Sequence, residues 1–379
     1  MTSTDSPRPV ILVAIDWYLP AYRAGGPIRS IANLVGALGL EVDFRIVCGN
    51  RDLGDTEDLP VSIGTWVTGD HATIQYLPQS DWTAPSWRRI LKEVQPDRLY
   101  LNSLYSGPFS RLPWKVARSM GIPTTLAPRG MLGPGALAMK PWRKKAWLMV
   151  QRLTGHYDAI HWHASTAQES QEIKRWFPKA SINIALNLPV PFDPIPLPQT
   201  KGNDGHETIH LLSVGRVHPI KNYALGVSLA NALGRAGHKV HYRIVGPVED
   251  PEEANKLRAS ADGIVLELMG ATPPSTIRRY LGEAHLILVP SLNENYGHAV
   301  AEAIACGRPV VVSNQTVWST LTTGTSVSCQ PLVLTAWVEA TNQLLSMTPE
   351  EVVEQSKLTY DQCLLDPEHI QAQRTLFYP

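Results

Sequence analysis

The chain has 379 residues, a length that predicts two domains of ordinary size. Hydrophobic residues make up 44% of it and the formal net charge is zero, so no nucleic-acid partner is expected. Four scattered cysteines without a CxxC pair, a polar N-terminus and the lack of a long apolar run predict a cytoplasmic protein with no secretory signal and no membrane span.

The first half of the chain alternates short apolar runs with helical patterns. Strands are predicted at 10–15, 44–49, 98–103, 124–128 and 159–166, and helices at 28–39, 86–94 and 113–121. This alternation is typical of a parallel sheet with helices on both faces. His156, His161 and His163 lie near the last strand, but no Cys, Asp or Glu joins them at metal-ligand spacing apart from Asp158 in a predicted loop. They are interpreted as structural.

A glycine pair follows the first predicted strand. Gly25 and Gly26 allow backbone to approach a ligand closely, and Pro27 suits the first turn of a helix. No third glycine stands in phase, so a dinucleotide-binding fingerprint is not formed. The alternative is a simple strand-to-helix turn.

The stretch KPWRKKAWLM (140–149) combines cations with aromatic residues. The four cations of Lys140–Lys145 and two tryptophans are compatible with peripheral contact at an anionic membrane face, or with contact to the pyrophosphate of an acceptor. The alternative is a solvated helix whose tryptophans pack inward.

Proline residues interrupt the pattern near the middle of the chain, so we expect an N-terminal domain at 1–190 and a linker at 191–206. The alternation restarts in a C-terminal domain, 207–379. Strands are predicted there at 209–216, 240–246, 264–270, 286–290 and 309–314, and helices at 223–237, 252–261 and 274–284. The predicted fold class is α/β, with two doubly wound Rossmann-like domains whose strands end at a cleft.

A basic loop follows the first strand of the second domain. Gly215 permits a close turn, and Arg216 and Lys221 lie in the loop that opens the next helix. Two cations at the carboxyl end of a strand suit a diphosphate leaving group. The alternative is an ordinary basic loop.

Two acids surround a helix start in the segment NENYGHAVAEA. Glu294 precedes the predicted helix, which begins at Gly297, His298 and Ala299, and Glu302 lies inside it. The first amides of a helix attract anions, whereas carboxylates accept hydrogen bonds from sugar hydroxyls. This pattern indicates a sugar-nucleotide site. The alternative is a helix cap at Glu294 and a solvated Glu302.

Together, Gly25-Gly26, the GRxxxxK spacing from Gly215 to Lys221, and Glu294 separated from Glu302 by seven residues resemble the retaining GT-B glycosyltransferases of family 4. The resemblance covers almost the whole chain, and it is greatest to the bacterial polysaccharide-assembly branch. It implies that Arg216 and Lys221 stabilise the diphosphate, Glu294 holds the sugar and Glu302 holds the ribose. The implied donor contacts also include Gly25, Gly26, Gly246, the backbone near Met269, and the amides of Gly297, His298 and Ala299. Arg129, in LAPRGML, occupies the place where many relatives have a His near the reacting carbon.

The implied function is metal-independent transfer, with retained configuration and no cofactor, from a nucleotide-diphosphate sugar to a lipid-linked saccharide. Such a reaction belongs to exopolysaccharide or lipopolysaccharide biosynthesis, with the acceptor on the N-terminal domain, the donor on the C-terminal domain, and a location in the cytoplasm or at the inner membrane face. No DxD, GxSxG or GxxxxGK[ST] motif is present. The alternatives are a sugar-nucleotide epimerase on this fold and an inactive nucleotide-sugar-binding protein. The sequence leaves open the donor, the linkage, the oligomeric state and whether the C-terminal tail docks on domain one.

Overall fold

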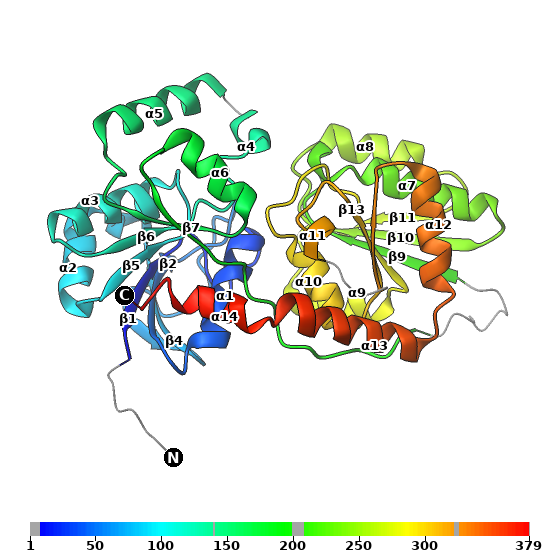
Figure 1. Ribbon diagram of the computed structural model, residues 1–379, viewed down its shortest axis with the longest axis horizontal. Coiled ribbons are helices and arrows are strands. Elements are labelled where there is room, and N and C mark those ends of the chain that lie inside the picture. The colour runs from blue at the N-terminus through cyan, green and yellow to red at the C-terminus, as the bar shows by residue number, and fades with distance from the viewer. Residues whose placement is uncertain (1–7, 139–140, 199–207, 322–325, 379) are drawn as a thin grey trace, which may run out of the picture. The chain divides into compact units, whose positions relative to one another are not determined.

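A computed structural model describes residues 8–138, 141–198, 208–321 and 326–378 (Figure 1). The chain divides into two compact units: residues 1–188 with 367–379 form the first, and 189–366 form the second. No helix within the described ranges is long and apolar enough to cross a membrane.

Unit 1 is built on an eight-stranded sheet in the order β3-β4-β2-β1-β5-β6-β7-β8. The strands are β1 Val10–Ala14, β2 Asp43–Gly49, β3 Trp66–Thr68, β4 Ala72–Leu77, β5 Arg98–Leu101, β6 Thr124–Leu126, β7 His161–Ala164 and β8 Ser181–Ile184. The helices are α1 Gly26–Leu38, α2 Ala84–Val94, α3 Leu112–Ser119, α4 Pro134–Ala138, α5 Pro141–Thr154, α6 Ala167–Trp176 and α14 Pro367–Arg374. Only β3 pairs antiparallel, in a short hairpin with β4 that the sequence patterns did not predict.

The C-terminal end of the chain belongs to the core of unit 1. The Phe377 ring packs edge-on against Phe44 of β2 and Tyr100 of β5, with centroids 5.7 and 5.6 Å apart. Arg374 of α14 donates two hydrogen bonds, of 2.8 and 2.6 Å, to the carboxylate of Glu41. Aromatic burial and a bidentate ion pair therefore hold the last helix on this unit.

Unit 2 has a six-stranded parallel sheet in the order β11-β10-β9-β12-β13-β14. The strands are β9 Thr208–Val214, β10 Lys239–Val245, β11 Val265–Leu268, β12 Leu286–Val289, β13 Val310–Ser313 and β14 Val327–Gln330. The helices are α7 Tyr223–Arg235, α8 Pro251–Ser260, α9 Pro274–Glu283, α10 His298–Ala305, α11 Trp318–Leu321, α12 Leu334–Leu345 and α13 Pro349–Thr359. The chain proceeds in opposite directions from the adjacent strands β9 and β12, so their carboxyl ends form a topological switch point, where open α/β sheets bind ligands.

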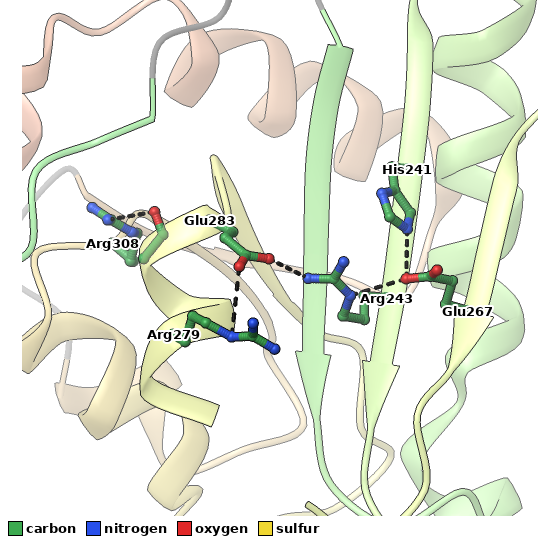
Figure 2. A network of polar contacts seen from close by, with 7 residues as sticks. His241, Arg243, Glu267, Arg279, Glu283 and Arg308 are labelled. Carbon is green, nitrogen blue, oxygen red and sulfur yellow. Dashed lines mark hydrogen bonds and ion pairs between the residues drawn. The ribbon is translucent and has the colours of Figure 1, made fainter. Parts of the chain in front are cut away.

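A polar network fastens α9 to this sheet (Figure 2). Arg243 of β10 donates to Glu267 of β11 at 3.0 Å and to Glu283 of α9 at 2.7 Å. Its guanidinium also lies 4.3 Å from the centroid of the Tyr280 ring. Because Arg243 bridges one strand to a neighbouring strand and a helix, it fixes the position of α9 against the sheet.

The described part of the proline-rich segment, 189–198, is held on unit 2 by a buried arginine. Arg308 is fully buried and donates to the carbonyls of Leu281, Ile195 and Pro196 at 2.6, 2.8 and 2.8 Å. Burial lowers the pKa of Arg308 to about 10, so the side chain stays charged at neutral pH. The segment is therefore packed rather than loosely attached, although proline prevents it from joining the sheet.

Candidate active site

Three glycines form a backbone wall at the carboxyl edge of the sheet in unit 2. Gly215, Gly246 and Gly270 follow β9, β10 and β11, and the amide of Gly246 donates to the carbonyl of Gly270 at 3.0 Å. A Cβ on Gly246 would lie 2.1 Å from the carbonyl oxygen of Gly215. Only glycine permits this approach, so the loops present bare backbone along one side of the site. Met269 lies next to Gly270 and is 38% exposed.

The basic loop and the acidic loop meet at the ends of β9 and β12. The Lys221 ammonium donates to Oε1 of Glu294, and the Ser291 hydroxyl donates to the same oxygen at 2.8 Å. The two loops are also joined through backbone, because the amide of Leu292 donates to the carbonyl of Ile220 at 2.8 Å. The structure thus brings together Lys221 and Glu294, two residues predicted to bind different parts of one ligand.

The short turn before α7 directs the side chain of Lys221 toward Glu294. Residues Pro219–Lys221 form a short 3-10 turn, which begins with His218 accepting a hydrogen bond from the amide of Ile220. Asn222 then takes a left-handed conformation with φ of 49° and starts α7 in a new direction. The side chains of Lys221 and Glu294 are only 17% and 14% exposed. Solvent therefore screens this ion pair less than a surface pair.

The helix start in unit 2 lies directly after the acidic loop. Gly297, with φ of 80°, caps α10, which His298 and Ala299 begin. A Cβ on Gly297 would lie 2.9 Å from Nε1 of Trp318. The first amides of a helix have no acceptor within the helix, so they and the helix dipole favour an anion here. Glu302, partly buried, lies about one turn inside the same helix.

Arg216 takes a different direction from Lys221. Its guanidinium donates to Glu249 at 3.0 Å, and the two side chains are 42% and 40% exposed. A surface ion pair of this kind contributes little to stability, about 0–1 kcal/mol. Contact between Arg216 and an anion at α10 would require exchange of this pair, at low energetic cost.

Tyr223 belongs to the site but was missed in the sequence. It is the first residue of α7, it is 3% exposed, and its hydroxyl has no hydrogen-bond partner among the described residues. A Cβ on Gly215 would lie 2.9 Å from that hydroxyl. Burial raises the pKa of Tyr223 well above its usual value, so the group is a neutral donor behind the glycine wall. In the sequence, only the Asn before it, a residue type that tolerates a left-handed backbone conformation at a helix start, indicates that Tyr223 begins α7 beside the site.

In unit 1, Arg129 is the centre of a hydrogen-bond network. It has φ of 54°, and its guanidinium donates to Asn102 at 2.6 Å, to Asn187 at 2.5 Å and to the hydroxyl of Tyr100 at 3.0 Å. The Asn102 amide in turn donates to the carbonyl of Pro27 at 3.3 Å. Arg129 therefore links the ends of β5 and β8 to the first turn of α1.

The glycine pair at α1 differs from the glycine wall in unit 2. Gly25 has φ of 66°, a conformation that favours glycine, but a Cβ there would meet nothing within 4 Å. Gly26 is the first residue of α1, directly before Pro27. The conformation explains Gly25 without a ligand, while the space beside it is open to one.

Two acids near the carboxyl edge of unit 1, Asp16 and Glu169, were not predicted as site residues. Asp16 follows β1 and accepts a 2.6 Å hydrogen bond from the Ser106 hydroxyl, and burial raises the pKa of its carboxyl. Glu169, 1% exposed, accepts from the amide of Gly130 at 2.5 Å and from the amide of Ser165 at 2.7 Å. Asp16 lies in no recognisable motif, so only its position after a strand could have indicated it. Glu169 is the last residue of the capping-box pattern that begins at Thr166, which indicates a structural role at the start of α6.

The histidines of β7 have no metal-ligand arrangement. His163 contacts the Tyr100 hydroxyl at 2.6 Å and the carbonyl of Ala185 at 2.8 Å, and burial lowers its pKa to about 3. Across the described ranges, no group of three or more His, Cys, Asp or Glu is placed to hold a metal ion. His163 is thus a neutral residue with two hydrogen-bond partners in the core of unit 1.

The two α/β units define the GT-B fold class, and solved structures share it. Sucrose-phosphate synthase from Thermosynechococcus elongatus aligns with a TM-score of 0.67 over 98% of both chains, at 16% identity. Anabaena Alr3699/HepE, solved in complex with UDP and glucose, aligns with a TM-score of 0.68 over 97% of this chain and 99% of its own, at 12% identity. Identities this low establish the fold alone.

Sequence comparison finds a family match within unit 2. Residues 208–347 match the family described as glycosyl transferases group 1. The amylovoran biosynthesis glycosyltransferase AmsK of Erwinia amylovora is 34% identical over 117 residues, 28% of this chain and 28% of its own. A GDP-mannose-dependent phosphatidylinositol dimannoside mannosyltransferase of Mycobacterium tuberculosis is 30% identical over 122 residues, 32% of this chain and 31% of its own. The chain thus aligns with less than a third of the length of each of these relatives.

Proposed function

We propose that the protein transfers a sugar, with retained anomeric configuration, from a nucleotide-diphosphate sugar to a saccharide acceptor. The observation that carries the proposal is the meeting of Lys221 and Glu294 beside the start of α10. A cation and helix amides suit a diphosphate, and a carboxylate suits sugar hydroxyls. AmsK and the lipopolysaccharide outer core galactosyltransferase WaaB, similar in sequence and in fold respectively, support a lipid-linked acceptor and a place in polysaccharide biosynthesis.

The contact between Lys221 and Glu294 is compatible with both proposed roles. An ammonium has three donors, and Glu294 accounts for one of them, so the same lysine can also donate to a phosphate. The described hydrogen bonds to Glu294 both reach Oε1, which leaves Oε2 as the acceptor for a sugar hydroxyl. Before the donor binds, each side chain holds the other in position.

In the proposed reaction, the bond from the anomeric carbon to the diphosphate oxygen breaks while the acceptor oxygen bonds to that carbon on the same face. The acceptor proton passes to an oxygen of the departing phosphate. Negative charge grows on the diphosphate as the bond breaks, and Lys221, Arg216 and the amides at Gly297 to Ala299 would stabilise that charge. Glu302 would hold the ribose, and the backbone near Met269 would meet the base.

We place the acceptor on unit 1, at the carboxyl edge of its sheet. Asp16 follows β1, which pairs with β5, the strand that Asn102 follows. Arg129 then acts as a positioning residue, because its donors already serve Asn102, Asn187 and Tyr100. Arg129 donates to Asn102, and Asn102 donates to the carbonyl of Pro27, so this chain of hydrogen bonds fixes the backbone at the edge.

Arg129→Lys is expected to lower kcat/KM for the acceptor by about tenfold or more, because one ammonium cannot reproduce three hydrogen bonds in a planar fork. Donor affinity should be unchanged, because Arg129 lies in unit 1. Initial rates with each substrate varied in turn measure the two effects, and Arg89→Lys on the exposed face of α2 is the control. Loss of donor affinity with normal acceptor kinetics would contradict the positioning role.

A screen of UDP- and GDP-sugars by thermal shift, followed by NMR of the reaction, tests the function. We expect at least one nucleotide sugar to raise the melting temperature and to transfer its sugar with retained configuration when a lipid-linked saccharide is added. An epimer formed from the donor alone would instead establish the epimerase. Donor binding without any turnover, across lipid-linked and free saccharides, would indicate the inactive binding protein.

A further inference from the structure

Helix α5 in unit 1 has one face packed on the protein and the opposite face exposed. Leu148 is fully buried, and Trp147 contacts the rings of Tyr105 and Tyr157 at centroid distances of 5.5 and 6.0 Å. Lys144 also faces inward, where it donates to the carbonyl of Ala136 at 2.5 Å and lies 5.3 Å from the centre of the Tyr105 ring. Three residues of the KPWRKKAWLM stretch therefore face the protein, and they include one of its two tryptophans.

The outward face of α5 carries large apolar side chains. Trp142, Met149 and Leu153 are 74%, 46% and 78% exposed. Trp142 and Met149 are seven residues apart, and Met149 and Leu153 are four apart. At 3.6 residues per turn, these spacings place all three on the same face of the helix. We call these three residues the α5 stripe. Such an aligned set differs from the single exposed apolar residues that any surface has.

Cations border the α5 stripe on both sides. Helical geometry places Lys145 and Arg152 on one side of it and Arg143 on the other, and all three are exposed. No Asp or Glu occurs in Pro141–Thr154. Lys140, which would extend this basic stretch, lies outside the described residues. An apolar line bordered by cations matches an anionic lipid surface, with aliphatic chains beneath a negative headgroup layer.

We propose that α5 lies in the headgroup region of an anionic membrane, with the α5 stripe inserted and Arg143, Lys145 and Arg152 on lipid phosphates. The proposal rests on the surface of α5 and does not depend on the transfer reaction. It replaces the Lys140–Lys145 region of the sequence interpretation with a defined face, because Trp147 and Lys144 are turned inward.

Co-sedimentation with vesicles tests the proposal on the full chain. The wild type should sediment with phosphatidylcholine vesicles that contain phosphatidylglycerol, but not with phosphatidylcholine alone, and high salt should release it. Trp142→Ser with Leu153→Ser should lower binding by about tenfold or more. Lys145→Gln with Arg152→Gln should lower it by about thirtyfold at low salt.

Leu40→Ser is the matched control, because Leu40 is 79% exposed in the same unit but stands beside the acid Glu41. It should bind like the wild type, and circular dichroism should show each variant folded. Wild-type protein that fails to bind anionic vesicles at low salt would overturn the proposal. So would a stripe variant that still binds vesicles but falls from dimer to monomer by light scattering, because that result makes the stripe a contact between copies of this chain.

Discussion

Lys221→Ala should lower kcat by about 100- to 1000-fold while weakening donor binding by less than about tenfold. The ammonium lies in a partly buried position with its partner Glu294, so its interaction with a phosphate is little screened by solvent. Its charge matters most when the diphosphate departs, because negative charge is then greatest. Single-turnover rates give the effect on chemistry, and calorimetric titration with the donor gives the effect on binding.

Lys256→Ala is the control for this prediction. Lys256 belongs to the same unit, but it pairs with Glu252 on the exposed surface of α8, and its removal should leave both constants unchanged. Glu294→Gln, alone and combined with Lys221→Ala, should show strongly non-additive effects, since the two side chains act as one unit. Equal losses of kcat and of donor affinity in Lys221→Ala would contradict a role for Lys221 in stabilising the leaving group.

Gly246→Ala should abolish the donor-induced thermal shift and lower the free energy of unfolding of unit 2 by about 2–4 kcal/mol. The new methyl group would lie 2.1 Å from the carbonyl oxygen of Gly215, so the loops after β9 and β10 would have to separate. Separation of the loops would displace the glycines that line the site, and it would also displace the turn Pro219–Lys221 that positions Lys221. Urea unfolding and thermal shift with the donor measure the two effects.

Gly263→Ala separates this steric clash from simple conformational strain. Gly263 also has a positive φ, of 70°, but a Cβ there would meet nothing within 4 Å. We expect a loss of about 1 kcal/mol in unfolding free energy and normal donor binding. If Gly246→Ala behaves like Gly263→Ala, the contact between the two loops is not what shapes the site.

The sequence predicted five of the six strands of unit 2 because each of the five is a short apolar run bounded by turn residues. It missed β14, Val327–Gln330, whose sequence VSCQ is largely polar and gives no apolar run. The ranges 209–216 and 240–246 differ from β9 and β10 by two residues or fewer at either end. The β3–β4 hairpin was missed, since its strands are partly exposed and interrupted by Gly69 and Asp70 rather than by a helix. Local periodicity gives no signal for so short an edge strand.

Long-range contacts could not be predicted from local patterns. Lys221 and Glu294 were each singled out, but their pairing joins residues 73 positions apart. The same holds for Arg374 and Glu41, 333 positions apart, which hold the last helix on unit 1. Local spacing indicates which chemistry a loop offers, whereas the order of strands in the sheet decides which loops meet.

A structure of the protein with its nucleotide-sugar donor tests the central claim most directly. We predict that the diphosphate lies against the amides of Gly297 to Ala299, with Lys221 on a phosphate oxygen. Glu294 should accept from hydroxyls of the transferred sugar, and Glu302 from the ribose. A diphosphate bound elsewhere, with Lys221 and Glu294 still paired only with each other, would contradict the account.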